Sequence, residues 1–345
     1  MNTLPLAQMT LPDTILEPII ILHLHPILLA LLPILIFYLI CQKQILNGVV
    51  NGAVNKFDRS LRRRIWESYT TRKLKTFTLH TQNTTYQMQI DAYGFLLHLY
   101  YGRKTDGVMD YLLTYADRGF SGNPHDTGND RTYSLDVLPQ EFPCRLTGDF
   151  RSPVLDLVNA DGSLGCDFRY QGYEICDGKY NLKGLPAVYA AEEEAQTLII
   201  YMKDQVTGLQ VELLYGVLPE YDVITRSAKV INTEEDKIRL TKAQAACIDF
   251  VHGEFDIISF YGRHAMERNM QRTPAGHGAF VIGSRRGTSS HQYNPMMILA
   301  EKETTEDAGT CYGMSFVYSG GFKAEVEKDQ FGQTRMQMGL QEEQF

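Results

Sequence analysis

The feature that most constrains this 345-residue chain is a repeated alternation of apolar and polar residues, which begins at about residue 75. Clear examples are the runs 86–90 (YQMQI), 209–213 (LQVEL) and 322–326 (FKAEV). A period of two sends successive side chains to opposite faces of a strand, which is typical of half-buried antiparallel strands. Turn-forming Asp-Gly pairs at 161–162 and 177–178 punctuate these runs. The pattern therefore predicts an all-β domain.

Many short strands without intervening helical periods favour two large packed sheets over a doubly wound fold with alternating helices. No internal repeat of fixed period is present in the sequence. The pattern therefore predicts an all-β fold class, with two large packed antiparallel sheets over residues 75–345.

Residues 1–70 differ from the rest of the chain in the distribution of apolar and charged residues. The segment 19–41 contains no charged residue and is long enough to cross a hydrocarbon core of ~30 Å as a helix. A basic stretch, 56–75, follows it and would leave the C-terminal body in the cytoplasm under the positive-inside tendency. The sequence thus predicts a possible transmembrane helix at 19–41, before the β domain. The alternative, which stays open, is that residues 1–70 are a translated leader that does not belong to the domain.

Charge and cysteine content exclude several classes of protein. The chain has a formal net charge of -8, and an acidic body argues against nucleic acid as the main partner. The six cysteines form no CxxC pair, and His252, His264 and His277 lack the spacing of metal ligands. Walker, HExxH and GxSxG motifs are also absent from the sequence. We therefore predict no metal site and no cofactor, and generic motifs identify no catalytic residue.

Longer segments carry a far more specific pattern. They are 130–141 (DRTYSLDVLPQE), 148–153 (GDFRSP), 184–189 (GLPAVY), 221–227 (YDVITRS), 284–295 (SRRGTSSHQYNP), 318–322 (YSGGF) and 329–335 (DQFGQTR). In this order they resemble the N-terminal domain of glycoside hydrolase family 36, the α-galactosidases. The resemblance covers roughly residues 75–345 and does not extend to residues 1–70.

The resemblance implies a β-supersandwich before a catalytic (β/α)₈ barrel, in an enzyme that removes terminal α-linked galactose from melibiose or raffinose with retention. Retention needs two nearby carboxyl groups. In the family both belong to barrel motifs resembling KWDMNR and CSGGGRFD, and neither motif occurs in these 345 residues. We therefore expect a chain that ends before the barrel and has no catalytic residue of its own. Whether it counts as an enzyme stays open, and we expect it to be inactive alone.

The resemblance also implies three substrate-binding residues. Asp117, within 116–121 (ADRGFS), matches a family aspartate that contacts galactose, and Arg131 matches an arginine of the same pocket. His264 stands where some members have a tryptophan that offers its flat face to the sugar. The competing interpretations are a solvated salt bridge between Asp117 and Arg131, and a strand histidine without a ligand at 264.

In oligomeric members of the family this domain contributes residues to the sugar pocket of a neighbouring subunit. The expected partners are therefore α-galactosides, further copies of the chain or a separate barrel chain, and the expected location is the cytoplasm. An alternative function is a membrane-tethered galactoside-binding or oligomerisation module without catalysis. A mutarotase-like enzyme is a third possibility, because related sandwiches occur in sugar epimerases.

Overall fold

The computed structural model describes residues 65–69, 75–119 and 122–343. These residues belong to one of two compact units, residues 63–345. Their regular structure consists of β-strands and short 3₁₀ turns, so the all-β part of the prediction agrees with the structure. The 3₁₀ turns are η2 (Asp110–Leu112), η3 (His125–Thr127), η4 (Glu192–Glu194) and η5 (Pro219–Tyr221).

Two of the sheets are simple antiparallel meanders in which consecutive strands are neighbours. The first contains β1 (Ile65–Tyr69), β2 (Lys75–His80), β3 (Thr84–Ile90) and β4 (Leu96–Arg103). The second contains β6 (Phe168–Asp177), β7 (Gln196–Asp204), β8 (Gln210–Leu218) and β9 (Val223–Ile231). Short connections make such local pairing the simplest arrangement.

The other two sheets bring together strands that are distant in sequence. In spatial order, the third contains β13 (Gly278–Ser284), β16 (Phe322–Lys328), β17 (Thr334–Leu340), β10 (Arg239–Phe250) and β5 (Leu155–Val158). The fourth contains β12 (Met266–Pro274), β11 (Phe255–Arg263), β14 (Tyr293–Glu301) and β15 (Cys311–Ser315).

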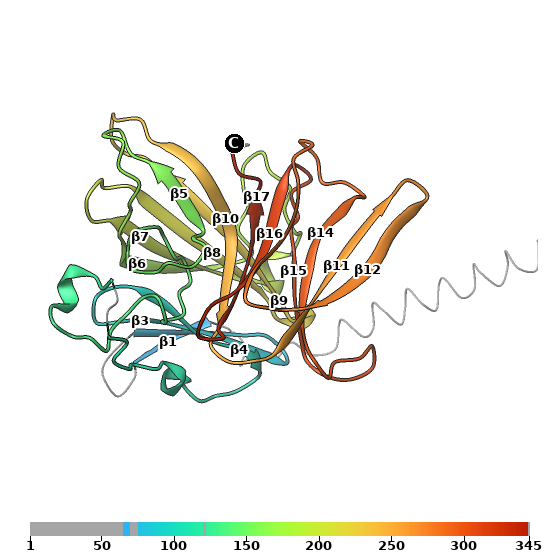
Figure 1. Ribbon diagram of the computed structural model, residues 1–345, viewed down its shortest axis with the longest axis horizontal. Helices are drawn as coiled ribbons and strands as arrows, with labels where there is room; N and C mark the ends of the chain where they lie inside the picture. The colour runs from blue at the N-terminus through green and yellow to red at the C-terminus, as the bar shows by residue number, and fades with distance from the viewer. Residues whose placement is uncertain (1–64, 70–74, 120–121, 344–345) are drawn as a thin grey trace, which may run out of the picture. The chain divides into compact units, whose positions relative to one another are not determined.

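The prediction of a large β-supersandwich is wrong. Within residues 63–345, the described strands form four small antiparallel sheets that follow one another as a propeller-like ring (Figure 1). Alternation along a strand indicates which of its faces is buried, but it does not show which strands are neighbours. Register shifts in β10 and β11 also bend these strands, which favours short sheets over continuous ones.

The predicted transmembrane helix at 19–41 lies outside the described residues. Among the residues that are described, no helix has the length and apolar character needed to cross a membrane. The division of the chain at residues 70 and 75, and the cytoplasmic location, stay predictions.

The apolar residues of the strands fill two large cores. The first joins the two meanders and includes Phe77, Met88, Leu198 and Leu213. The second lies between the third and fourth sheets and includes residues such as Phe322. Burying such side chains stabilises the fold by roughly 1.5–3 kcal/mol each.

One expected half-buried strand is buried on both faces. In β3 the polar residues Gln87 and Gln89 are as inaccessible as their apolar neighbours. Their amides find partners nonetheless, because Gln87 donates to the carbonyl of Gly107 (2.8 Å) and Gln89 to the hydroxyl of Thr76 (3.2 Å). The alternation thus located the strand correctly, and tertiary packing covered its second face.

A buried carboxylate links the two meanders. Glu141 Oε1 accepts hydrogen bonds from Tyr86 (2.6 Å) and from His98 Nδ1 (2.8 Å). Its Oε2 accepts from Tyr215 (2.9 Å) and from Arg226 Nη1 (2.8 Å). Burial raises the pKa of a carboxyl group, but the Arg226 charge and these hydrogen bonds outweigh it, so the pKa of Glu141 is lowered. This site is saturated with protein partners and forms a structural clamp.

A second buried network ties β17 and β10 to the segment 149–151. The guanidinium of Arg335 donates to both oxygens of Asp249 (2.7 Å each) and to Asp149 Oδ2 (2.7 Å). Arg151 donates to both oxygens of Asp149, at 2.9 Å and 3.0 Å. The two cations and two carboxylates compensate one another where solvent does not reach.

Asp249 makes the stability of the fold sensitive to acid. Burial raises the pKa of this carboxyl, but Arg335 and Arg151 outweigh it and lower the pKa to about 2, against 3.8 for an ordinary aspartate. A depressed folded-state pKa contributes stability above pH ~4, which is lost as pH falls towards ~2. The contribution is about 2 kcal/mol. Urea unfolding at pH 5 and pH 2.5 should show this loss, and Asp249→Asn should flatten it. An unchanged pH dependence in Asp249→Asn would contradict the assignment.

Candidate functional site

Asp117 and Arg131 form an ion pair on the surface. Arg131 Nη2 lies 3.1 Å from Asp117 Oδ1, and the two side chains are 64% and 54% exposed, respectively. The same carboxylate oxygen accepts a hydrogen bond from the backbone N–H of Gly119 (2.7 Å). The structure therefore brings these two predicted site residues together. Because both stay open to solvent, the carboxylate remains available to a hydroxyl group of a ligand.

The chain on either side of this pair is anchored to the body. Tyr133, two residues after Arg131, is buried and donates its hydroxyl hydrogen to Asp91. Arg118, next to Asp117, lies over the ring of Phe331 with 4.6 Å between guanidinium carbon and ring centre. These contacts hold an exposed pair on a fixed base, as recognition of a small polar ligand requires.

His264 lies at the exposed turn between β11 and β12. The next residue, Ala265, has a left-handed φ of 60°, and its N–H donates to Glu267 Oε1 (2.9 Å). A register shift between Tyr261 and Arg263 marks a bulge in this hairpin. Bulges re-aim side chains and occur often beside active sites. The imidazole of His264 is thus presented to solvent on a shaped hairpin.

A hollow of about 460 Å³ opens beside this hairpin. It is lined by Glu267, Arg268, Ser289, Ser290, His291, Asn294 and Pro295. No sequence pattern indicated this hollow, although the motif 284–295 contains all five of its lining residues that follow β13. Glu267 and Arg268 belong to β12, so the site depends on two segments that only the fold brings together.

Of the three predicted residues, Asp117 and Arg131 are in contact, whereas His264 belongs to a different segment of the body. The segment between β4 and β5, teal to green, lies at the lower left of Figure 1, whereas the β11–β12 hairpin lies at the right. Asp117 and Arg131 belong to the former segment and His264 to the latter.

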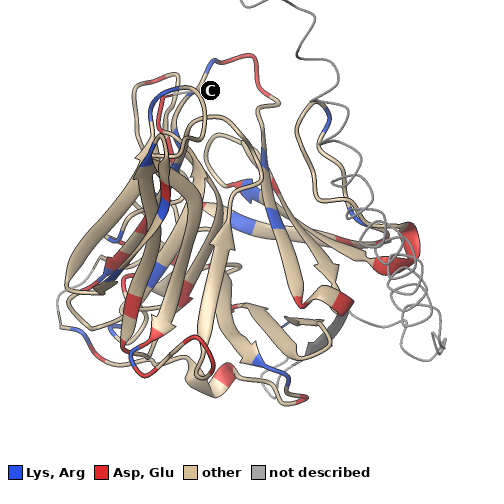
Figure 2. Cartoon of the chain, turned by 90° about the vertical axis from the view of Figure 1, so that its right-hand side faces the viewer, with Lys and Arg blue, Asp and Glu red and all other residues tan. Residues whose placement is uncertain are grey.

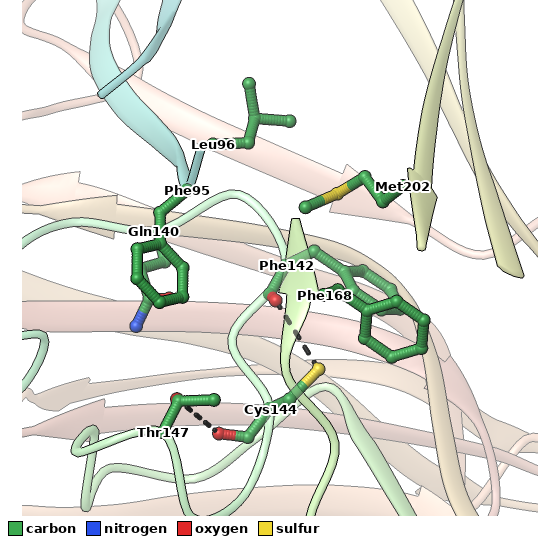
Figure 3. Close-up of a pocket in the computed structure, with 8 residues that line it drawn as sticks. All are labelled: Phe95, Leu96, Gln140, Phe142, Cys144, Thr147, Phe168 and Met202. Atoms are coloured by element: carbon green, nitrogen blue, oxygen red, sulfur yellow. Dashed lines mark hydrogen bonds between the residues drawn. The ribbon is translucent and has the colours of Figure 1, made fainter. Parts of the chain in front are cut away.

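The interior offers no alternative site of useful size near Cys144. A cavity there has a volume of about 10 Å³, enough for no more than a single water molecule. Figure 3 shows Cys144 donating to the carbonyl of Phe142 (3.6 Å) and accepting from Thr147 at its own carbonyl (3.1 Å). This cavity is a packing defect in the core.

Charges are mixed over the body. Figure 2 shows basic and acidic residues interspersed along the described strands, unlike the continuous basic stripe that binds nucleic acid. Among the described residues, no three His, Cys, Asp or Glu side chains lie close enough to hold a metal ion. His277 instead contacts the carbonyl oxygen of Asp329 (2.7 Å).

Comparison with known proteins gives a consistent result. A family model described as the glycosyl hydrolase family 36 N-terminal domain matches residues 94–345. The chain is 63% identical over 271 residues to the bifunctional alpha-galactosidase/sucrose kinase AgaSK of Mediterraneibacter gnavus, covering 79% of this chain and 29% of that protein. It is 41% identical over 273 residues to alpha-galactosidase Mel36A of Lactobacillus acidophilus, covering 79% and 37%. The chain thus spans roughly a third of the length of these curated relatives.

Solved structures agree with these matches. The galactosidase domain of AgaSK superposes with a TM-score of 0.78 and 62% identity, covering 81% of this chain and 39% of that chain. A variant of the alpha-galactosidase AgaA of Geobacillus stearothermophilus, solved in complex with raffinose, superposes with a TM-score of 0.75 and 40% identity. That match covers 77% of this chain and 37% of the other.

Proposed function

Since this chain belongs to glycosyl hydrolase family 36, we propose that it forms the substrate-recognition and assembly part of a retaining α-galactosidase. The observation that carries this proposal is the anchored, solvent-open pair of Asp117 and Arg131. Its relatives are named alpha-galactosidases, and one relative was solved with raffinose. A terminal α-linked galactose is therefore the ligand that we assign to this pair.

The chemistry of the pair suits binding rather than bond cleavage. A retaining glycosidase needs two carboxyl groups about 5–5.5 Å apart, one as nucleophile and one as acid and base. Asp117 is paired instead with a guanidinium, which fixes the direction of the carboxylate. In this role the carboxylate accepts hydrogen bonds from sugar hydroxyls, while Arg131 orients it.

Assembly of two chains would bring the Asp117–Arg131 pair and His264 to the same ligand. Because the two segments lie on different sides of the body (Figure 1), His264 of one chain and Asp117 of another complete a shared pocket. His264 then provides a hydrogen bond to a hydroxyl group, with less apolar contact than an indole ring would offer. A second copy of this chain is the partner that this arrangement requires.

We expect the 345-residue chain to bind melibiose through its galactosyl unit. Replacing Asp117 by Asn removes the charged acceptor and loosens Arg131, so binding should weaken roughly tenfold, the effect of losing one hydrogen bond to a charged group. Saturation-transfer NMR with melibiose measures this. The matched control is Asp307→Asn, at an exposed aspartate in the β14–β15 turn. Equal binding by Asp117→Asn and the parent chain would overturn the assignment.

We further expect no release of the aryl alcohol from an aryl α-galactoside by the purified 345-residue chain. The reason is chemical: the family's two barrel motifs do not occur in this sequence. Turnover that persists through purification and is absent from a mock preparation would show that these residues carry catalysis.

A further inference from the structure

An aromatic side chain stands beside the Asp117–Arg131 pair. The ring of Tyr115 stacks on the ring of Tyr133, with 6.4 Å between the ring centres and 29° between the planes. Tyr115 precedes Asp117 by two residues, and Tyr133 follows Arg131 by two. The ring contact and the ion pair therefore join the same two stretches of chain, which pass each other in opposite directions.

The ring of Tyr115 and the carboxylate of Asp117 lie within reach of a single sugar unit. Two residues of chain span at most ~7 Å between their Cα atoms. The chain from 113 to 118 contains no helix or turn, and residues two apart in extended chain point to the same side. Because Tyr115 is 38% exposed, part of its ring is accessible to a ligand that contacts Asp117.

Tyr115 rests on a rigid base. Tyr133 is 3% exposed and packs edge-on against Tyr93, with 4.8 Å between the ring centres. Leu113 packs against the same buried cluster, so the chain is attached to the core two residues before Tyr115. A tyrosine has only two side-chain torsions, so holding its ring in one orientation costs little conformational entropy.

A flat aromatic ring next to a carboxylate is complementary to galactose. The axial 4-hydroxyl of this sugar leaves the C–H groups at C3, C4 and C5 together on one face. The negatively polarised face of an aromatic ring attracts such C–H groups, while the sugar hydroxyls donate to the carboxylate. Glucose has an equatorial 4-hydroxyl and lacks this continuous apolar face, so the combination favours galactose over glucose.

We propose that Tyr115 is a specificity-determining residue, whose ring packs against the apolar face of the galactosyl unit that Asp117 holds. The inference rests on the proposed function, because it assumes that the Asp117–Arg131 pair binds galactose. Asp117 then binds hydroxyl groups of the sugar, and Tyr115 distinguishes the stereochemistry at C4.

The test is an NMR titration of the full 345-residue chain with methyl α-galactoside and, for comparison, methyl α-glucoside. Protons that stack on an aromatic ring move upfield, so the protons at C3, C4 and C5 of the galactoside should shift upfield on binding. Tyr115→Leu should remove these shifts and weaken galactoside binding about threefold to tenfold, the contribution of one aromatic contact. The preference for the galactoside over the glucoside should fall by the same factor.

Two further variants serve as controls. Tyr115→Phe keeps the ring and should keep both the upfield shifts and the galactoside preference. The matched control is Tyr111→Leu, at a tyrosine of η2 that is 72% exposed, which should leave both unchanged.

The results separate this inference from the proposed function. Upfield shifts in the parent and in Tyr115→Phe that Tyr115→Leu loses, at an unchanged urea midpoint, support stacking on Tyr115. Galactoside that binds the parent without upfield shifts overturns the inference, needs no variant, and leaves the proposed function standing. Equal galactoside binding by the parent and Tyr115→Leu, with weaker binding by Asp117→Asn, has the same meaning. If Asp117→Asn binds as the parent does, the proposed function fails and this inference falls with it.

Discussion

Replacing Glu141 by Gln is expected to destabilise the folded body by about 3–5 kcal/mol, which is the cost of breaking a buried ion pair from one side. The carboxylate is fully buried and is the charge partner of Arg226, whose side chain is 9% exposed. An amide at this position keeps the volume but places an N–H group against donors. Because the amide keeps one oxygen, either Tyr86 or Tyr215 loses its acceptor, and Arg226 loses the carboxylate that balances its charge.

Urea unfolding at pH 7 measures this effect as a lower midpoint. The matched control is Glu212→Gln, where the carboxylate pairs with Lys229 (3.0 Å) at a partly exposed site. Surface pairs contribute about 0–1 kcal/mol, so the control should hardly shift the midpoint. If both variants shift it equally, Glu141 does not clamp the two meanders.

Replacing Arg335 by Met should be comparably destabilising, by about 3–5 kcal/mol at pH 7. The change leaves Asp149 and Asp249 buried together, with Arg151 as the remaining cation in contact with both. Since two carboxylates now share one guanidinium, the charged form of Asp249 is disfavoured and its pKa should rise. The variant should therefore regain part of its lost stability as the pH falls from 7 towards 4, a range over which the Asp249 contribution in the parent chain stays constant.

The measurement is the urea midpoint of Arg335→Met as a function of pH, compared with Arg239→Met at an exposed site in β10 of the same sheet. A second variant, Arg335→Met with Asp249→Asn, should recover stability at pH 7 because it removes the uncompensated charge. Failure of the double variant to exceed the single one would refute the charge argument, whatever the size of the initial loss.

Urea unfolding also serves as the folding control for the binding measurements. Asp117 lies outside both buried networks, so Asp117→Asn should keep the parent's urea midpoint. Loss of sugar binding by a fully folded variant then reports on the site itself.

The amino-acid sequence by itself determined the strands and the family. The alternating runs 86–90, 209–213 and 322–326 coincide with or overlap β3, β8 and β16, because period two is a local property of the chain. The Asp161-Gly162 pair lies in a turn where Gly162 has a φ of 84°, a conformation that glycine adopts at little cost. Motifs such as 284–295 are long and specific enough to indicate the family by their residues alone.

Only the tertiary structure decided how the strands are grouped and where the site lies. Sheet membership depends on pairing between distant segments, such as β5 with β10, which no local pattern encodes. For the same reason, sequence could suggest a pair between Asp117 and Arg131 but not its separation from His264. The hollow beside Arg268 arises where a bulged hairpin meets a loop from another part of the sequence, so it too depends on the tertiary structure.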